Sequence, residues 1–225
     1  MGRRELHFRL AGINNQNFLM RDEETGSWWQ QVSGKAIFGE LQGQALDPVL
    51  SDELSFALWK QEVPAGQVLA PVVADENQYD SNWEPATQKY PTPFSYPGSG
   101  LQPRDVVIGL ELGSSSRAYP VERISEETPV QDRLSGTPIL LAIGPDGKSI
   151  RVFISRLKGA DLELFRKSDT AEWMLVDSST NSEWNFQGCA TAGPAQGHCL
   201  ERLPAIKDYW FDWRNYHPQT SIYRH

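Results

Sequence analysis

The sequence predicts a mainly β protein: a duplicated β unit whose first copy is incomplete, with short helices and a proline-rich connecting strap. Three observations predict this class: an internal repeat, short runs of alternating apolar residues, and many turn-forming residues. The 225 residues include 18 Gly and 15 Pro, which favour frequent turns and few long helices. Only 39% of the residues are hydrophobic, but the 8 Trp, 9 Phe and 7 Tyr supply core volume.

The repeat is a series of identical residues at matching spacing. The offset between the copies is 155 residues up to Trp29 and Trp184, and 154 residues from Gly34 and Gly188 onward. Such a shared register indicates an internal duplication. The main matched pairs are Asp22 and Asp177, Thr25 and Thr180, Ser27 and Ser182, Trp29 and Trp184, Gly34 and Gly188, Ala36 and Ala190, Gly39 and Gly193, Leu46 and Leu200, and Trp59 and Trp213.

The first, truncated repeat is predicted over residues 1–70. Alternating apolar residues from Leu6 to Met20 predict two short strands around a turn at Asn14-Asn15. Asp22 to Gly26 is predicted to be a turn, because Asp can bind the backbone ahead of it and Gly tolerates positive φ. Residues 27–46 then form strands separated by glycines.

A short helix and the strap follow these strands. Ser51 is expected to cap the helix, and Pro64 ends it. Residues 71–104 alternate prolines with aromatic residues, whereas a disordered linker would be poor in aromatics. We therefore expect an extended strap that lies against the body of the protein.

The second, complete repeat is predicted over residues 105–225. Its clearest feature is a hairpin joined through Gly144-Pro145-Asp146-Gly147. The predicted elements are strands at 105–112, 118–124, 137–143, 149–154 and 162–165 and a helix at 204–213.

Charge and motifs exclude several function classes. The net charge of −8 argues against nucleic acid or an anionic membrane as the main partner. No apolar run approaches the roughly 20 residues of a membrane span, and the sequence as given carries no secretory signal. The sequence also lacks a phosphate loop, a dinucleotide fingerprint and a metalloprotease motif. We expect a protein without enzymatic activity.

The repeated polar residues are predicted to be structural. Asp and Thr bind the local backbone, Ser spaces the turn, and Trp fills the interior. The alternative is a catalytic Ser–Asp pair at Ser27 or Ser182, but no histidine has a motif-level link to either serine. Chemistry is therefore expected where the repeats differ.

Four residues of the second repeat differ from the first and can carry thiol or metal chemistry: Cys189, His198, Cys199 and His217. Three alternatives remain open. The cysteines form a disulfide, all four residues bind Cu or Zn, or the cysteines are buried, unreactive thiols. The spacing matches no standard zinc finger, and adjacent His198 and Cys199 would point to opposite faces of a strand.

The aromatic run Tyr209 to Trp213 also allows two interpretations. It could form a stacking platform for a sugar or another flat ligand. We favour a core-facing helix, because Trp213 matches Trp59 of the first repeat.

The two repeats are unequal in length. Strands over residues 105–159, about 55 residues, precede the shared part of the second repeat, and the first repeat lacks most of their equivalent. An incomplete sheet leaves a strand edge open, and open edges recruit partners. We therefore expect a protein partner or self-association at the N-terminal half.

Two groups of motifs match a known family. They are 22–31, Gly34 to Gly39 and Trp59, and then Arg117-Ala118-Tyr119-Pro120, Asp132 and Gly136-Thr137-Pro138. These motifs resemble domain of unknown function 3179, a large family of bacterial proteins. The resemblance implies a mostly β fold and, for many members, a periplasmic or extracellular location; it implies no activity.

One departure from this family affects the chemistry. Many members have a Cys-Pro pair in the hairpin after the Tyr-Pro motif, which suggests thiol or metal chemistry. Here the place is Ile143-Gly144-Pro145-Asp146-Gly147, so the proline remains and the cysteine is gone. A redox role of that cysteine cannot be carried over to this chain.

The leading function is a non-catalytic structural or accessory module that acts through protein–protein contacts and needs no cofactor. The alternative is a metal-binding (Cu or Zn) or thiol-redox protein that uses Cys189, His198, Cys199 and His217.

Overall fold

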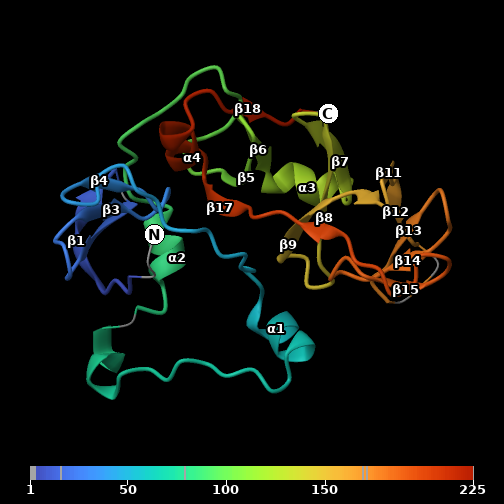
Figure 1. The fold of residues 1–225 in the computed structure, drawn as a ribbon, viewed down its shortest axis with the longest axis horizontal. Helices are drawn as coiled ribbons and strands as arrows, with labels where there is room; N and C mark the ends of the chain where they lie inside the picture. The colour runs from blue at the N-terminus through green and yellow to red at the C-terminus, as the bar shows by residue number, and fades with distance from the viewer. Residues whose placement is uncertain (1–3, 16, 79, 169, 171, 225) are drawn as a thin grey trace. The chain divides into compact units, whose positions relative to one another are not determined.

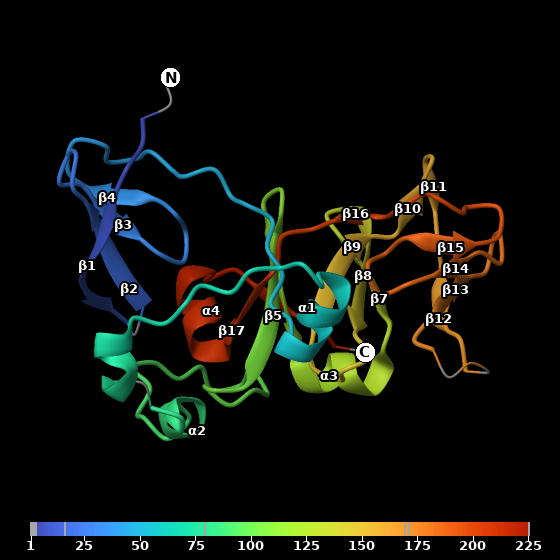
Figure 2. The same cartoon turned by 90° about the horizontal axis from the view of Figure 1, so that it is seen from below.

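A computed structural model describes residues 4–15, 17–78, 80–168, 170 and 172–224 (Figures 1 and 2). The structure is mainly β, with 36% strand and 13% helix, as predicted. The chain divides into two compact units, residues 1–50 and residues 51–225.

The first unit is built on one four-stranded antiparallel sheet, and its strands pair in chain order. The predicted strand pair around Asn14-Asn15 is confirmed, with Asn15 at a positive φ of 52°. Asp22 to Gly26 forms the predicted turn, and Gly26 has a φ of 71°. The strands are β1 (Phe8–Asn14), β2 (Asn17–Asp22), β3 (Trp28–Gln30) and β4 (Ala36–Phe38).

The described part of the second unit holds three four-stranded sheets and a two-stranded ribbon. The first sheet has the order β17 (Ile206–Tyr209), β5 (Val106–Leu112), β6 (Ser115–Pro120) and β18 (Ser221–Ile222). The second has the order β16 (Glu201–Arg202), β9 (Ile150–Ile154), β8 (Thr137–Ile143) and β7 (Val130–Leu134). The third is β12 (Leu164–Arg166), β13 (Leu175–Asp177), β14 (Glu183–Trp184) and β15 (Ala190–Ala192); the ribbon is β10 (Arg156–Leu157) and β11 (Ala160–Asp161).

The β8–β9 hairpin is the centre of the second unit and confirms the predicted hairpin. Alternate side chains of an extended strand point to opposite faces. Leu141 and Val152 pack with Ile108 and other residues of β5 and β6 on one face. Leu140 and Phe153 pack against the third sheet on the other face. Both faces of this hairpin are therefore covered, which explains its nearly continuous apolar sequence.

The helix predicted from Ser51 begins later. In α1 (Phe56–Glu62) the N-cap is Ser55, whose side chain accepts a hydrogen bond from Leu58 N. Residues before the helix are held by the β8–β9 region of the same unit, because Asp52 binds Arg151 and Ser55 N donates to Ser149 Oγ. These long-range contacts move the helix start. The predicted repeat over 1–70 thus contributes a sheet to the first unit and α1 to the second.

Two other predicted elements end or begin at different residues. The strand predicted at 118–124 ends at Pro120, which has no N–H to continue the ladder, and α3 (Val121–Glu127) follows. Within the helix predicted at 204–213, residues Ile206–Tyr209 instead form the strand β17, because they pair with the edge of β5. The helix itself is α4 (Trp210–Tyr216).

Two short helices interrupt the segment predicted as an extended strap: η1 (Val73–Gln78) and α2 (Trp83–Thr87). The side chain of Trp83 is 61% exposed. Among the described residues of this segment, Tyr96 and Leu101 contact the core around Trp210.

Candidate functional site

The matched aspartates anchor a tryptophan in each of two sheets. Asp177 is fully buried and accepts hydrogen bonds from Trp184 Nε1 at 3.0 Å and Thr180 Oγ1 at 2.8 Å. Asp22 accepts the same bonds from Trp29 Nε1 and Thr25 Oγ1, each at 2.8 Å. The sequence matches therefore coincide with matching hydrogen bonds.

The matched serines close the same loop in both sheets. Ser182 Oγ accepts a hydrogen bond from Ala195 N at 2.9 Å, and Ser27 Oγ accepts one from Leu41 N at 3.0 Å. A Cβ at Gly193 would lie 2.7 Å from Ser182 Cα, so the chain needs glycine at this close approach. Ser182 has no accessible surface and its hydroxyl is already engaged. This geometry serves packing rather than nucleophilic attack.

The carboxylate of Asp177 is held in its charged form. Burial alone would raise its pKa, but hydrogen bonds from Trp184, Thr180 and Ser179 outweigh burial and lower the pKa to about 2. A general base needs a pKa near the working pH. The charge state of Asp177 therefore suits an anchor of the turn.

Cys189 and Cys199 form a disulfide, the first of the three alternatives that the sequence left open. They stand opposite each other in an isolated antiparallel bridge, at the positions that Lys35 and Ala45 occupy in the first unit. The disulfide thus joins two backbone segments that also meet without it in the first unit.

The two histidines make different contacts from the cysteines. The His217 ring stacks on Trp213 with centroids 3.6 Å apart, and its Nε2 lies 3.0 Å from Glu111 Oε1. His198 is half-buried next to Cys199. Among the described residues no group of three or more His, Cys, Asp or Glu side chains could hold a metal. The four proposed ligands therefore do not form a preassembled site.

The aromatic run Tyr209 to Trp213 belongs to the core, as we favoured. Trp210, Phe211 and Trp213 are each at most 2% exposed. The Arg104 guanidinium lies over the rings of Tyr209 and Phe211, at 5.1 and 5.3 Å from their centroids. The run thus offers no bare ring face of the kind that a sugar platform needs.

The Arg117–Pro120 segment ties three strands together. Arg117 binds Asp132 of β7 and donates from Nε to Ser221 Oγ of β18 at 3.0 Å. The Tyr119 hydroxyl donates to the same Asp132 at 2.8 Å. Burial, followed by this hydrogen bond, raises the pKa of Tyr119. A neutral, buried tyrosine in an ion-pair network indicates a structural role.

Sequence reasoning missed one pair of acidic residues. Asp208 in β17 and Asp212 in α4 lie close together, and Asp212 is only 7% exposed. Burial raises the pKa of Asp208 to about 7, and the neighbouring Asp212 carboxyl adds to the effect. The available signal in the sequence was one aspartate directly before the aromatic run and a second one within it.

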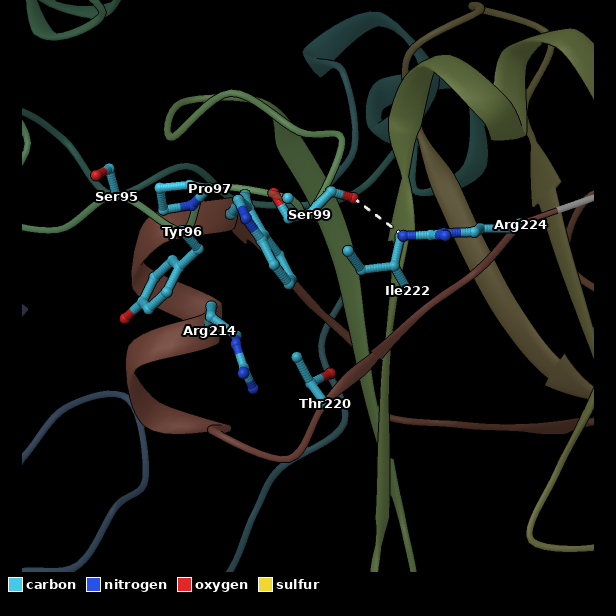
Figure 3. A pocket seen from close by; sticks show the side chains of 10 residues that line it. Ser95, Tyr96, Pro97, Ser99, Arg214, Thr220, Ile222 and Arg224 are labelled. Atoms are coloured by element: carbon cyan, nitrogen blue, oxygen red, sulfur yellow. Dashed lines mark hydrogen bonds between the residues drawn. The ribbon is translucent and has the colours of Figure 1, made fainter.

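The second unit has an open pocket of about 530 Å³ beside α4 and β18 (Figure 3). Its charged lining residues are Arg214 and Arg224. Arg214 lies near Thr220, whereas Arg224 lies at the right of the view and donates to Ser99 O (Figure 3). The two guanidinium groups therefore do not converge on one anion. Neither Asp208 nor Asp212 lines this pocket.

The two matched sheets differ strongly in how their apolar faces are covered. Leu200, which packs with the third sheet of the second unit, is 4% exposed, whereas the matched Leu46 in the first unit is 39% exposed. The other pairs follow the same trend. Leu162, Leu164, Leu175 and Ala195 are buried, and their counterparts Leu6, Phe8, Met20 and Leu41 are half-buried. We call the face formed by Leu6, Phe8, Met20, Leu41 and Leu46 the open face.

Fold and sites thus define a mainly β protein with one disulfide and two matched sheets. The chain belongs to the DUF3179 family, described as protein of unknown function, which matches residues 1–220. This confirms the resemblance seen in the motifs. No curated protein and no solved structure matches the chain.

Proposed function

We propose that the protein is a non-catalytic structural or accessory module, that it acts through protein–protein contact, and that the open face is its contact surface. The proposal includes an internal duplication, with β1–β4 and β12–β15 as the shared parts of two copies. The observation that carries it is the difference in burial between Leu46 and Leu200. Exposed apolar patches of this kind mark interaction sites in soluble proteins.

The matching hydrogen bonds support the duplication. The two sheets share the hydrogen bond from tryptophan to aspartate and the loop closed by a serine. We take these shared contacts as one design, repeated in both sheets. In the sheet β12–β15 that design includes a covering layer, formed by Leu140 and Phe153. The sheet β1–β4 therefore needs a corresponding layer from elsewhere.

We propose further that the protein works outside the cytoplasm. The Cys189–Cys199 disulfide supports an oxidising compartment. Among the described residues, the helices are too short or too polar to cross a membrane. The alternative of a Cu or Zn site has less support, because the two sulfur atoms that would bind the metal are bonded to each other. The thiol-redox alternative stays a prediction, because a disulfide is the oxidised form of such a centre.

Photo-crosslinking in the native cells tests the contact surface. A photoreactive amino acid replaces Leu46 on the open face, or Arg9, whose neighbour Phe8 points to the open face. We expect a cross-linked species of higher mass from position 46 and none from position 9. Equal adducts at both positions, or none at position 46, contradict the proposal.

A further inference from the structure

We infer that the open face binds an antiparallel β-hairpin of a different protein, one that presents a leucine and a phenylalanine as direct cross-strand neighbours. This inference rests on the proposed function and specifies the partner. The chain itself provides the template, because the matched sheet β12–β15 is covered by a hairpin of that description.

The template is the β8–β9 hairpin. Leu140 and Phe153 face each other across its two strands, and each is 1% exposed. Both side chains pack into one cluster with Leu164, Leu175 and Trp184. A directly opposed aliphatic and aromatic pair is a favourable unit of sheet stabilisation. The hairpin therefore offers a compact Leu–Phe surface to the sheet beneath it.

A glycine marks the place of the aromatic ring. A Cβ at Gly188 would lie 2.4 Å from Phe153 Cε1, so the ring rests directly on this glycine. At the matched Gly34 the nearest atoms all belong to Leu46, the closest being its Cβ at 3.6 Å. The positive φ of 63° already accounts for glycine at position 34. The two glycines differ in their neighbour: the Phe153 ring lies over Gly188, whereas Leu46 makes ordinary van der Waals contact at Gly34.

A second copy of this chain is not the expected occupant. Its own β8–β9 hairpin is covered on one face by β12–β15 and on the other by β5 and β6. The Leu–Phe pair of another copy is therefore already in use. We therefore propose that another protein supplies the hairpin, and we expect it to cover Leu6, Phe8, Met20, Leu41 and Leu46.

A peptide copy of the template provides the probe. A cyclised hairpin with the sequence of residues 137–154, extended with lysines for solubility, is titrated with the full chain and followed by fluorescence anisotropy. We expect saturable binding. The Phe153→Ala peptide should bind at least tenfold more weakly, because it lacks the ring that lies over the matched Gly188 in the template. Absent binding, or equal binding of both peptides, overturns the inference.

Variants of the chain locate the binding surface. Leu46→Asp should abolish binding, whereas Leu69→Asp, at a residue 95% exposed and outside the sheet, should leave it unchanged. Because Leu46→Asp could disturb the first unit, hydrogen exchange of the wild-type chain is the second measurement. The peptide should slow exchange in β1–β4. Retained binding by Leu46→Asp, or protection confined to residues 51–225, contradicts the inference.

The partner and the proposed function can fail separately. If position 46 forms a photo-adduct in cells while the peptide does not bind, the function stands and the hairpin partner is wrong. If sedimentation shows that the chain dimerises and Leu46→Asp restores the monomer, a second copy occupies the face and the inference is overturned. If position 46 forms no adduct and the peptide does not bind, both proposals fall.

Discussion

At the scale of single residues, a buried carboxylate organises each matched sheet. The Asp177 carboxylate accepts the indole N–H of Trp184 and the backbone N–H of Thr180, at 3.0 and 2.6 Å. A buried donor left without an acceptor costs about 1–3 kcal/mol. Removing this one side chain would leave both donors unpaired. The same cost applies in the sheet β1–β4, where Asp22 accepts the indole N–H of Trp29.

Replacing Asp177 with alanine should therefore destabilise the second unit by about 2–4 kcal/mol. Urea denaturation monitored by tryptophan fluorescence measures the loss. Alanine at Asp47, an exposed aspartate, is the control and should change the stability by less than about 0.5 kcal/mol. A variant with wild-type stability would show that the anchor is dispensable.

The same carboxylate gives a pH dependence of known sign. Its folded-state pKa, about 2, is lower than its ordinary value. The stabilisation is therefore complete above the unfolded-state pKa near 4 and is lost as the pH falls through about 2. The difference in stability between wild type and Asp177→Ala should shrink over this range.

The contribution of Asp208 to stability depends on pH in the opposite direction. Because burial and Asp212 raise its folded-state pKa to about 7, the folded protein prefers the neutral acid. Its contribution to stability is greatest below pH 4 and is lost as the pH rises through about 7. Asp208→Asn should therefore raise stability at pH 8 by about 1 kcal/mol or more and flatten the profile between pH 4 and 7. Chemical denaturation at each pH measures this difference. Equal stability of Asp208→Asn and wild type at every pH would contradict the prediction.

At the scale of elements, the disulfide closes a short loop between strands that pair in any case. A crosslink over 10 residues is expected to contribute about 2–3 kcal/mol by restricting the unfolded chain. The double replacement Cys189→Ser and Cys199→Ser should lose this amount without a change of fold. Alkylation and intact mass of protein prepared without reductant should find no free thiol. Two free thiols would contradict the disulfide.

The attachment of α1 depends on one buried arginine. Arg151 is 4% exposed and binds both Asp52 and Glu62, at 2.8 and 2.6 Å. Removing one member of such a buried network leaves charges without a counter-ion and costs about 3–5 kcal/mol. Arg151→Ala should expose α1 to protease at low concentrations. Arg123→Ala, at an exposed ion pair in α3, is the control and should leave digestion unchanged.

The elements also show what sequence reasoning can reach. The β8–β9 hairpin was predictable because its apolar runs and its Gly-Pro-Asp-Gly turn are both local signals. The start of α1 and the strand character of β17 were not, because contacts over about 100 residues decide them. The disulfide was one of three alternatives, since spacing alone does not determine pairing. The proximity of Asp208 and Asp212 could not be predicted from the sequence, because it depends on where β17 ends and α4 begins.

At the scale of the whole molecule, the two units differ in how much apolar surface they bury. Of the buried hydrophobic residues described, only Trp29 and Ala36 belong to residues 1–50. Units of this size are marginal even with a complete core. The first unit is therefore expected to open at a lower free energy than the second, and the molecule should not unfold in a single two-state transition.

Hydrogen exchange tests this difference directly. Amides of β2 and β3 should exchange at least tenfold faster than those of β8 and β9, because the open face lacks the layer that covers the matched sheet. In urea, these amides should lose protection before the change in fluorescence of the buried Trp184 and Trp213. Equal protection in both units, with one coincident transition, would show that the sheet β1–β4 is complete without a partner. A partner that covers the open face should remove the difference, because ligand binding to the folded state adds to its stability.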